Sequence, residues 1–267
     1  ERLGRLSESL PRVYVLAACA AVASGNVGFD QGINADSGPF VQQDLGLSEE
    51  QLELSLGLEQ AAAIVGALTV SSISDRLGRR TGFVAAPLLC IVGRLCLLAA
   101  NSYWHLLLGR VLVGIGVGAN LTIAPLYVTE IAPPSCRGFL GSWPEIANCV
   151  CMLTAFLVGS CLHTLPASQA WRAMSASGLV LPVVMLVLVK AFMLESPRWL
   201  LRQRRREEAA EVLELLYPMG TDIDAVADEI ADSIVAEEKA NKGAEWSSLI
   251  SSPGRRRMLF LGVAVAC

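Results

Sequence analysis

Long apolar runs, separated by short polar stretches, fill most of the chain. Six of them reach the length of a membrane-spanning helix, which needs about 20 mainly apolar residues to cross about 30 Å of hydrocarbon. These runs cover residues 13–34, 53–73, 82–101, 106–127, 139–162 and 171–194. They lack the two-residue alternation of barrel strands, and lipid tolerates only helices or closed barrels. The pattern therefore predicts an all-α membrane protein with six transmembrane helices.

The polar segments divide the rest of the chain. We expect a cytosolic N-terminus at 1–12, the six-helix bundle at 13–194, a cytosolic helical linker at 195–257 and the truncated start of a seventh transmembrane helix at 258–267. Within the linker, residues 204–217 and 222–241 place apolar side chains at helical spacing opposite charged ones. This spacing predicts two or three amphipathic helices that lie against the end of the bundle.

Composition agrees with a membrane protein and argues against other classes. Charged residues make up 17% of the chain and apolar residues 53%, whereas a soluble domain usually carries more charge. The basic residues form no aromatic-laced stripe, so nucleic-acid binding is not expected. Six of the eight cysteines lie in apolar runs and none has metal-site spacing, so we expect structural thiols and no metal.

Arginines in the short polar segments predict how the chain is oriented. Lys and Arg gather in the cytosolic loops of membrane proteins. The biased segments precede the first helix, join the second to the third and join the fourth to the fifth, with Arg2, Arg5, Arg12, Arg76, Arg79, Arg80 and Arg137. The N-terminus and the linker are therefore expected in the cytosol. We expect an integral, multi-pass protein of the plasma membrane, with an internal membrane as the alternative.

Three charged clusters fall at the cytosolic ends of the predicted helices. Their members are Asp75, Arg76, Arg79 and Arg80 in SDRLGRR, Glu130 and Arg137 in YVTEIAPPSCRG, and Glu195 and Arg198 in ESPRWL. Exposed ion pairs contribute only about 0–1 kcal/mol each. A network of such pairs adds little stability and can break and re-form. We therefore interpret the clusters as a cytosolic gate network.

The order of these motifs resembles the sugar porter family of the major facilitator superfamily. DRLGRR follows the second helix, GRVLVGIGVG opens the fourth, PLYVTEIAPPSCRG ends it and ESPRWL follows the sixth. The stretch RGFLGSWPE is most similar to the proton-coupled polyol and monosaccharide symporters of that family. The resemblance implies twelve helices in two six-helix halves, of which this chain matches the first. The remaining C-terminal half of the same protein is then its partner, and this half alone is not expected to transport.

Asp30 and Arg110 lie inside predicted transmembrane helices, where an ionisable group usually has a partner or a water-filled cavity. We expect these two side chains to pair directly. A buried carboxylate that loses its arginine takes up a proton more readily. The pair therefore suits a proton switch in which a proton on Asp30 releases Arg110, and the family resemblance implies the same pair. The alternative is a static salt bridge that fixes the first helix on the fourth.

Glu145 follows Pro144 in the fifth predicted helix. In much of the family a glutamine at this place hydrogen-bonds a sugar hydroxyl, so the resemblance implies a substrate-binding role for Glu145. A carboxylate accepts two hydroxyl hydrogen bonds strongly. The alternative is an acid that lines the pore without touching substrate.

The stretch GIGVGA, residues 114–119, also fits the glycine fingerprint of dinucleotide-binding proteins. That fingerprint requires a preceding strand and a helix start that faces a phosphate. Here the glycines lie within an apolar helical run, so we expect Gly114 and Gly118 to allow close helix packing instead.

Several residues depart from the family pattern. They are Ser71 in place of a usual glycine and the polar or charged residues Glu59, Gln60, Arg94 and Lys190 within predicted helices. The stem of Lys190 can snorkel to the nearby interface. For Arg94, the candidate partners are Glu59 and Glu145.

The sequence as a whole predicts a proton-coupled sugar or polyol transporter that works by alternating access. Its expected partners are a monosaccharide or polyol, the lipid bilayer and protons as the coupling ion, with no other cofactor. A facilitator without proton coupling is one alternative, and a transport-inactive sugar sensor is another. An enzyme is not expected, because no nucleophile with a base, metal cluster or phosphate loop stands in a credible context.

Overall fold

The computed structural model describes residues 10–218 and 220–241. Six helical segments are long and apolar enough to cross a membrane, as the apolar runs predict. Four of them are single helices: α2 (Leu10–Leu45), α3 (Glu49–Leu77), α4 (Arg79–Leu98) and α5 (Tyr103–Ile131). The other two are each divided in two: α6 (Arg137–Gly141) with α7 (Trp143–Leu162), and α8 (Ala167–Ser177) with α9 (Val180–Ala191).

The helices extend beyond the apolar runs that predict them. The first run ends at residue 34, but α2 continues to Leu45 and carries Asp36 and Asp44 in this extension. The fourth run ends at residue 127, and α5 continues through Glu130. Apolarity marks only the part of a helix that lipid surrounds, whereas the backbone hydrogen bonds continue into the polar ends.

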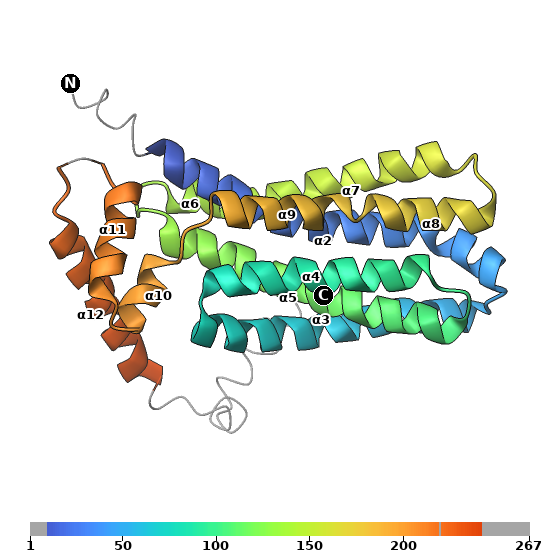
Figure 1. Ribbon diagram of the computed structural model, residues 1–267, viewed down its shortest axis with the longest axis horizontal. Coiled ribbons are helices and arrows are strands. Elements are labelled where there is room, and N and C mark those ends of the chain that lie inside the picture. The colour runs from blue at the N-terminus through green and yellow to red at the C-terminus, as the bar shows by residue number, and fades with distance from the viewer. Residues whose placement is uncertain (1–9, 219, 242–267) are drawn as a thin grey trace, which may run out of the picture.

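The six spans run along a common axis (Figure 1). Helix α2 packs along α7, and α5 packs along both α3 and α4. Helices α2 and α5 also contact each other, and this contact joins the two groups into one bundle. We call the end of the bundle at which the helices after residue 195 lie the linker end.

Within the described residues, three further helices lie at the linker end (Figure 1), where the sequence predicts two or three. They are α10 (Pro197–Arg202), α11 (Arg206–Leu216) and α12 (Ile223–Asn241). The apolar face of α11 is buried through Ala209, Leu213 and Leu216, while its charged face is exposed. The expected start of a seventh helix at 258–267 lies outside the described residues, as do residues 1–9 and 242–257.

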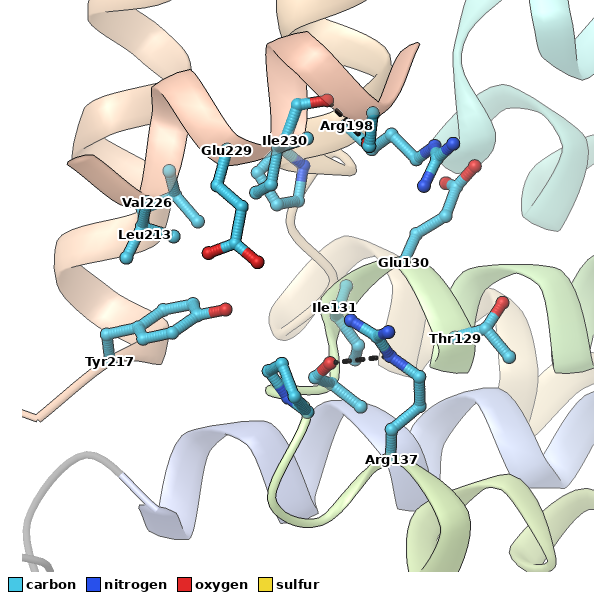
Figure 2. A pocket seen from close by; sticks show the side chains of 14 residues that line it. Thr129, Glu130, Ile131, Arg137, Arg198, Leu213, Tyr217, Val226, Glu229 and Ile230 are labelled. Atoms are coloured by element: carbon cyan, nitrogen blue, oxygen red, sulfur yellow. Dashed lines mark hydrogen bonds between the residues drawn. The ribbon is translucent and has the colours of Figure 1, made fainter. Parts of the chain in front are cut away.

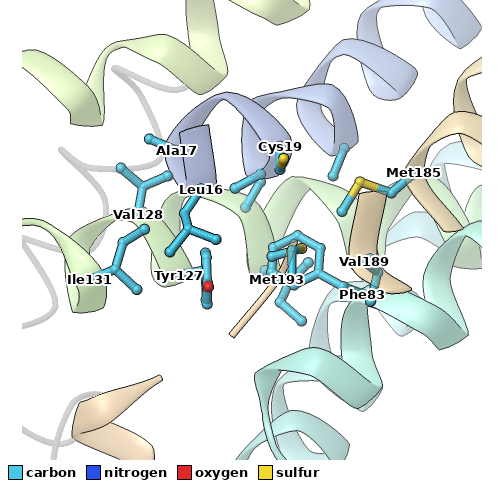
Figure 3. Packing of buried hydrophobic residues seen from close by; sticks show 14 of the residues in the cluster. Leu16, Ala17, Cys19, Phe83, Tyr127, Val128, Ile131, Met185, Val189 and Met193 are labelled. Carbon is cyan, nitrogen blue, oxygen red and sulfur yellow. The ribbon is translucent and has the colours of Figure 1, made fainter. Parts of the chain in front are cut away.

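A buried apolar cluster holds the spans together near the linker end (Figure 3). The Tyr127 ring on α5 lies edge-on to Phe83 on α4, with ring centroids 5.3 Å apart. Its hydroxyl donates a 2.8 Å hydrogen bond to the backbone carbonyl of Leu194, which follows α9. Leu16 of α2 and Met193 complete the contact. Four spans are thereby fixed next to the charged residues of the linker end.

Candidate functional site

Four charged side chains from four different spans meet inside the bundle. They are Asp30 on α2, Glu59 on α3, Arg94 on α4 and Arg110 on α5, each no more than 3% exposed. Arg94 Nη2 lies 2.7 Å from Asp30 Oδ1, and Arg110 Nη1 lies 2.8 Å from Glu59 Oε2. Two acids therefore face two bases. A charge away from water is tolerated only when it is paired in this way.

Asn34 connects the two ion pairs. It lies one helical turn after Asp30, so both side chains project from the same face of α2. Its Nδ2 donates to Asp30 Oδ2 at 3.0 Å and to Glu59 Oε1 at 2.7 Å. Its Oδ1 accepts a hydrogen bond from Arg110. Both acids and one base thus share a single half-buried amide, and we call these five residues the buried charge network.

The structure does not form the expected direct pair of Asp30 with Arg110. Asp30 pairs with Arg94, and Arg110 pairs with Glu59. Arg94 likewise has neither of its candidate partners, Glu59 or Glu145. The physical reason is that one additional base and one additional acid stand beside the expected pair, and each takes one of its members. Asp30 and Arg110 remain in one network, joined through the amide of Asn34.

Close helix packing encloses the network. A Cβ atom on Gly114 would lie 2.3 Å from the backbone oxygen of Glu59, and one on Gly118 would lie 1.8 Å from that of Ala63. Helix α5 therefore approaches α3 as closely as only glycine permits. A Cβ atom on Gly178 would lie 2.1 Å from Arg94 Nη1, so the guanidinium rests directly on the α8–α9 junction. The glycine run lies inside α5, against another helix and not at the start of one.

The hydrogen bonding of the network is incomplete. Among the described residues, the Nε atoms of Arg94 and Arg110 have no hydrogen-bond partner. Arg94 Nη1 reaches the backbone carbonyl of Ser175 only at 3.5 Å. Most buried polar side-chain atoms in proteins have at least one hydrogen-bond partner. The two guanidinium groups are therefore paired by charge without being fully satisfied.

A second charged cluster lies at the linker end, at the start of α4. Arg79 donates to Glu130 on α5 through Nη2 at 2.7 Å and through Nε at 2.9 Å. Its Nη1 lies 2.7 Å from Asp75 Oδ1 on α3. Arg79 is buried, and two parallel bonds to one carboxylate give this pair a fixed geometry. One arginine thereby ties α3, α4 and α5 together.

Glu195, which follows α9, joins the same cluster through the backbone. Its carboxylate accepts from the N–H groups of Arg79 at 2.6 Å, Ser196 at 3.1 Å and Arg80 at 3.3 Å. It therefore caps the start of α4, where free N–H groups favour an anion. The turn needs Gly78, whose φ is +100° and whose missing side chain leaves room for the carboxylate. Burial raises the pKa of the Glu195 carboxyl, and these backbone hydrogen bonds offset part of that rise.

The linker helices connect to this cluster at Asp75, and Arg198 joins two of them to each other. Its Nη2 lies 2.6 Å from Glu237 Oε2 on α12, and Arg202 lies 3.7 Å from the same carboxylate. Trp199 Nε1 donates a 2.9 Å hydrogen bond to the backbone carbonyl of Asp75. Helices α10 and α12 are thereby attached to the end of α3.

The remaining arginines of the predicted gate network make no ion pair within the described residues. Arg76 and Arg80 are exposed, and Arg137 donates from Nε to the backbone carbonyl of Ala132 at 3.2 Å. Arg137 instead lines a cavity of about 230 Å³ between the bundle and the linker helices, together with Glu130, Arg198 and Tyr217. Figure 2 shows these side chains facing one another across the cavity.

Glu145 lies apart from both clusters. It is exposed in the first turn of α7, and its nearest polar contacts are Asn148 Nδ2 at 3.5 Å and Cys149 Sγ at 3.8 Å. Its carboxylate therefore keeps most of its capacity to accept hydrogen bonds.

The apolar pattern and the motifs do not single out Asn34, and they mark Glu59 and Arg94 only as departures from the family pattern. The available signal was the spacing of Asn34, one helical turn from the buried acid Asp30. For Glu59 and Arg94 the signal was their opposite charge inside two predicted spans. Pairing them correctly required the relative rotation of four helices, which the sequence does not contain.

Comparison with known proteins identifies the family. The sequence model described as "Sugar (and other) transporter" matches residues 16–267. An Arabidopsis thaliana protein described as probable polyol transporter 4 is 34% identical over 97% of this chain and half of its own length. The glucose transporter GlcP of Staphylococcus epidermidis is 30% identical over 95% of this chain and 54% of its own length. The chain thus spans about half the length of the curated relatives it matches.

The fold matches that of solved structures of a xylose transporter. A proton:xylose symporter, XylE, bound to 6-bromo-6-deoxy-D-glucose superimposes with a TM-score of 0.80 at 22% identity, over 86% of this chain and 54% of that one. A partially occluded, inward-open form of XylE from E. coli gives 0.78 over 85% and 60%. With six candidate spans among its described residues, the chain is an integral, multi-pass membrane protein. As the motifs predict, it belongs to the sugar transporter family, a family of transporters and not of enzymes.

Proposed function

We propose that this chain forms the N-terminal half of a proton-coupled carrier for monosaccharides or polyols. The carrier works by alternating access, with the N-terminus and the linker end in the cytosol of a plasma-membrane protein. The observation that carries the proposal is the buried charge network. Ionisable groups inside a membrane are costly, and they usually serve transport or proton transfer.

The network has the parts that proton coupling needs. Asp30 is buried, carries one base as a partner and shares Asn34 with Arg110. A proton on Asp30 cancels its charge and removes the attraction that holds Arg94. Since Asn34 bonds Asp30 and Arg110 alike, a change at the acid reaches Arg110 on α5. Protonation thereby alters the forces between α2, α4 and α5, which is how a proton can favour one orientation of the binding site.

The cluster around Arg79 supplies the inner gate. Asp75, Glu130 and Glu195 hold Arg79 and the start of α4 while the linker end keeps the observed arrangement. We infer that these bonds form in one orientation of the carrier and break in the other. The Arg79–Glu130 pair is buried, and the desolvation cost of a buried pair offsets much of its attraction, so its net energy is compatible with a reversible contact.

The substrate class follows from the relatives and from Glu145. The relatives include proteins described as polyol and glucose transporters. The exposed carboxylate of Glu145 has few polar contacts, so it can accept hydrogen bonds from two substrate hydroxyls. We propose that it contributes one wall of a site completed by the C-terminal half.

Uptake by cells that express the complete carrier, with this chain joined to its second six-helix half, tests the proposal. We expect radiolabelled sugar or polyol to accumulate when the outside is acidic and to stop accumulating when a protonophore removes the gradient. Asp30→Asn should abolish this accumulation. A facilitator without proton coupling predicts equilibration that ignores both pH and the protonophore. A transport-inactive sensor predicts substrate binding without uptake.

A further inference from the structure

Arg110 has one acid partner in the buried charge network, and that acid is Glu59. The contact is 2.8 Å long and fully buried. Asp30 holds a different base, Arg94, at 2.7 Å. A proton on Asp30 therefore frees Arg94 directly, whereas release of Arg110 requires the charge on Glu59 to be cancelled. The two acids control different arginines on different helices.

We propose that Glu59 is a second proton-binding site of the carrier, which exchanges a proton with the pathway and thereby controls Arg110. This inference rests on the proposed proton-coupled function and adds a second acid to it. The step is a proton transfer from a hydronium ion in the pathway to Glu59 Oε2, which leaves a water molecule. The carboxylate becomes a neutral carboxyl group, and the ion pair with Arg110 is lost. The proton returns to water when the pathway opens to the other side.

A second acid lies close to Glu59 in the buried charge network. The charged or titratable groups near Glu59 are Arg110 on α5, Asp30 on α2 and the Cys90 thiol on α4, while Arg94 pairs with Asp30. A second acid so near raises the cost of keeping both carboxylates ionised, because like charges in one buried site oppose each other. Asn34, which donates to both, is only half-buried and gives the network its most accessible member.

The hydrogen-bond geometry also leaves Arg110 able to move. Its Nε has no partner within the described residues, so its bond to Glu59 and its bond to Asn34 carry most of its attachment. Once Glu59 is neutral, the nearest remaining negative charge of the network is Asp30, which Asn34 already links to Arg110. Re-pairing with Asp30 then draws α5 toward α2 and away from α3.

The first test compares Glu59→Gln with Glu53→Gln in the complete carrier. Glu53 lies on the same helix but is exposed, so the control makes the same chemical change outside the network. We expect Glu59→Gln to lose accumulation driven by a pH gradient while it still exchanges labelled for unlabelled substrate, and Glu53→Gln to keep both. Full gradient-driven accumulation by Glu59→Gln would overturn the inference, although the proposed function would stand if Asp30→Asn still lost it.

A second measurement is needed if the Glu59→Gln variant shows neither gradient-driven accumulation nor substrate exchange. The infrared difference between purified carrier at acidic and at neutral pH reports the C=O stretch of buried carboxyl groups that take up a proton. We expect one such band in the wild type and in Glu53→Gln that is missing from Glu59→Gln. An identical set of bands in all three proteins rules out proton binding at Glu59. This readout needs no transport, so it separates failure of the inference from failure of the proposed function.

Discussion

At the scale of single residues, Arg94 shows how a buried base differs from an exposed one. Its side chain is 1% exposed and lies against Asp30 and the backbone at Gly178. Removing one member of a buried pair leaves the other charge without compensation, and this costs more than the pair itself contributes. An exposed arginine can lose its charge with little effect, because water solvates whatever remains.

We therefore expect Arg94→Gln to lower the free energy of unfolding of the carrier in detergent by about 3–5 kcal/mol. Arg12→Gln, at an exposed position on α2, should change it by no more than about 0.5 kcal/mol. The double variant Asp30→Asn/Arg94→Gln should recover part of the loss, because the stranded carboxylate is then neutral. If Arg94→Gln unfolds at the same denaturant concentration as Arg12→Gln, the ion pair with Asp30 does not hold the bundle.

Glu195 gives the linker end a pH dependence of its own. Burial raises the pKa of its carboxyl above the ordinary value of 4.5, and the N–H groups of Ser196 and Arg79 oppose the rise only in part. An acid with a raised pKa binds more protons in the folded state than in the unfolded state. Its contribution to stability is therefore largest at acid pH and falls as pH rises above the ordinary value.

Glu195→Gln removes this titration and supplies the comparison. The free energy of unfolding of the wild type, minus that of the variant, should decrease as pH rises from about 4 to about 7. Urea unfolding of both proteins in detergent at several pH values measures the difference. A difference that grows over the same interval would mean that the backbone hydrogen bonds outweigh burial and lower the pKa instead.

At the scale of helices, the apolar pattern predicts the number and order of the spans, since both follow from length and hydropathy alone. It predicts their ends less well, because α2 and α5 continue into polar residues that still satisfy the helical backbone. The charged motifs at the helix ends predict a network of ion pairs there, and Asp75, Arg79 and Glu130 form such pairs. The sequence does not predict which acid pairs with which arginine inside the bundle, because this pairing depends on how far each helix is rotated about its own axis.

The contact of α5 with α3 is a helix-scale feature that a single methyl group can test. Gly118→Ala would place a Cβ atom 1.8 Å from the Ala63 carbonyl oxygen, so the helices must separate. We expect a loss of at least about 2 kcal/mol in the free energy of unfolding, within the range for overpacking. Gly57→Ala on α3 has no atom within 4 Å of its new Cβ and should be neutral or stabilising. Equal melting temperatures for the two variants would contradict the close packing.

At the scale of the whole molecule, two charged clusters lie at different levels of one bundle and share three helices, of which α3 carries both Glu59 and Asp75. Arg79 and Arg94 both lie on α4, and Glu130 and Arg110 both lie on α5. A shift of α4 or α5 that follows re-pairing in the buried charge network therefore reaches the cluster at the linker end directly. Movement of these shared helices can therefore transmit the proposed proton step to the proposed gate, and no other helix is needed.

Proton movement that accompanies substrate is the most direct test of this coupling. The complete carrier, reconstituted into liposomes without a pH gradient, receives a saturating pulse of a transported sugar or polyol while an external pH electrode records the medium. We predict alkalinisation of the medium in step with substrate uptake by the wild type, and none with Asp30→Asn. Substrate uptake by the wild type without any change in external pH would contradict proton coupling through the buried charge network.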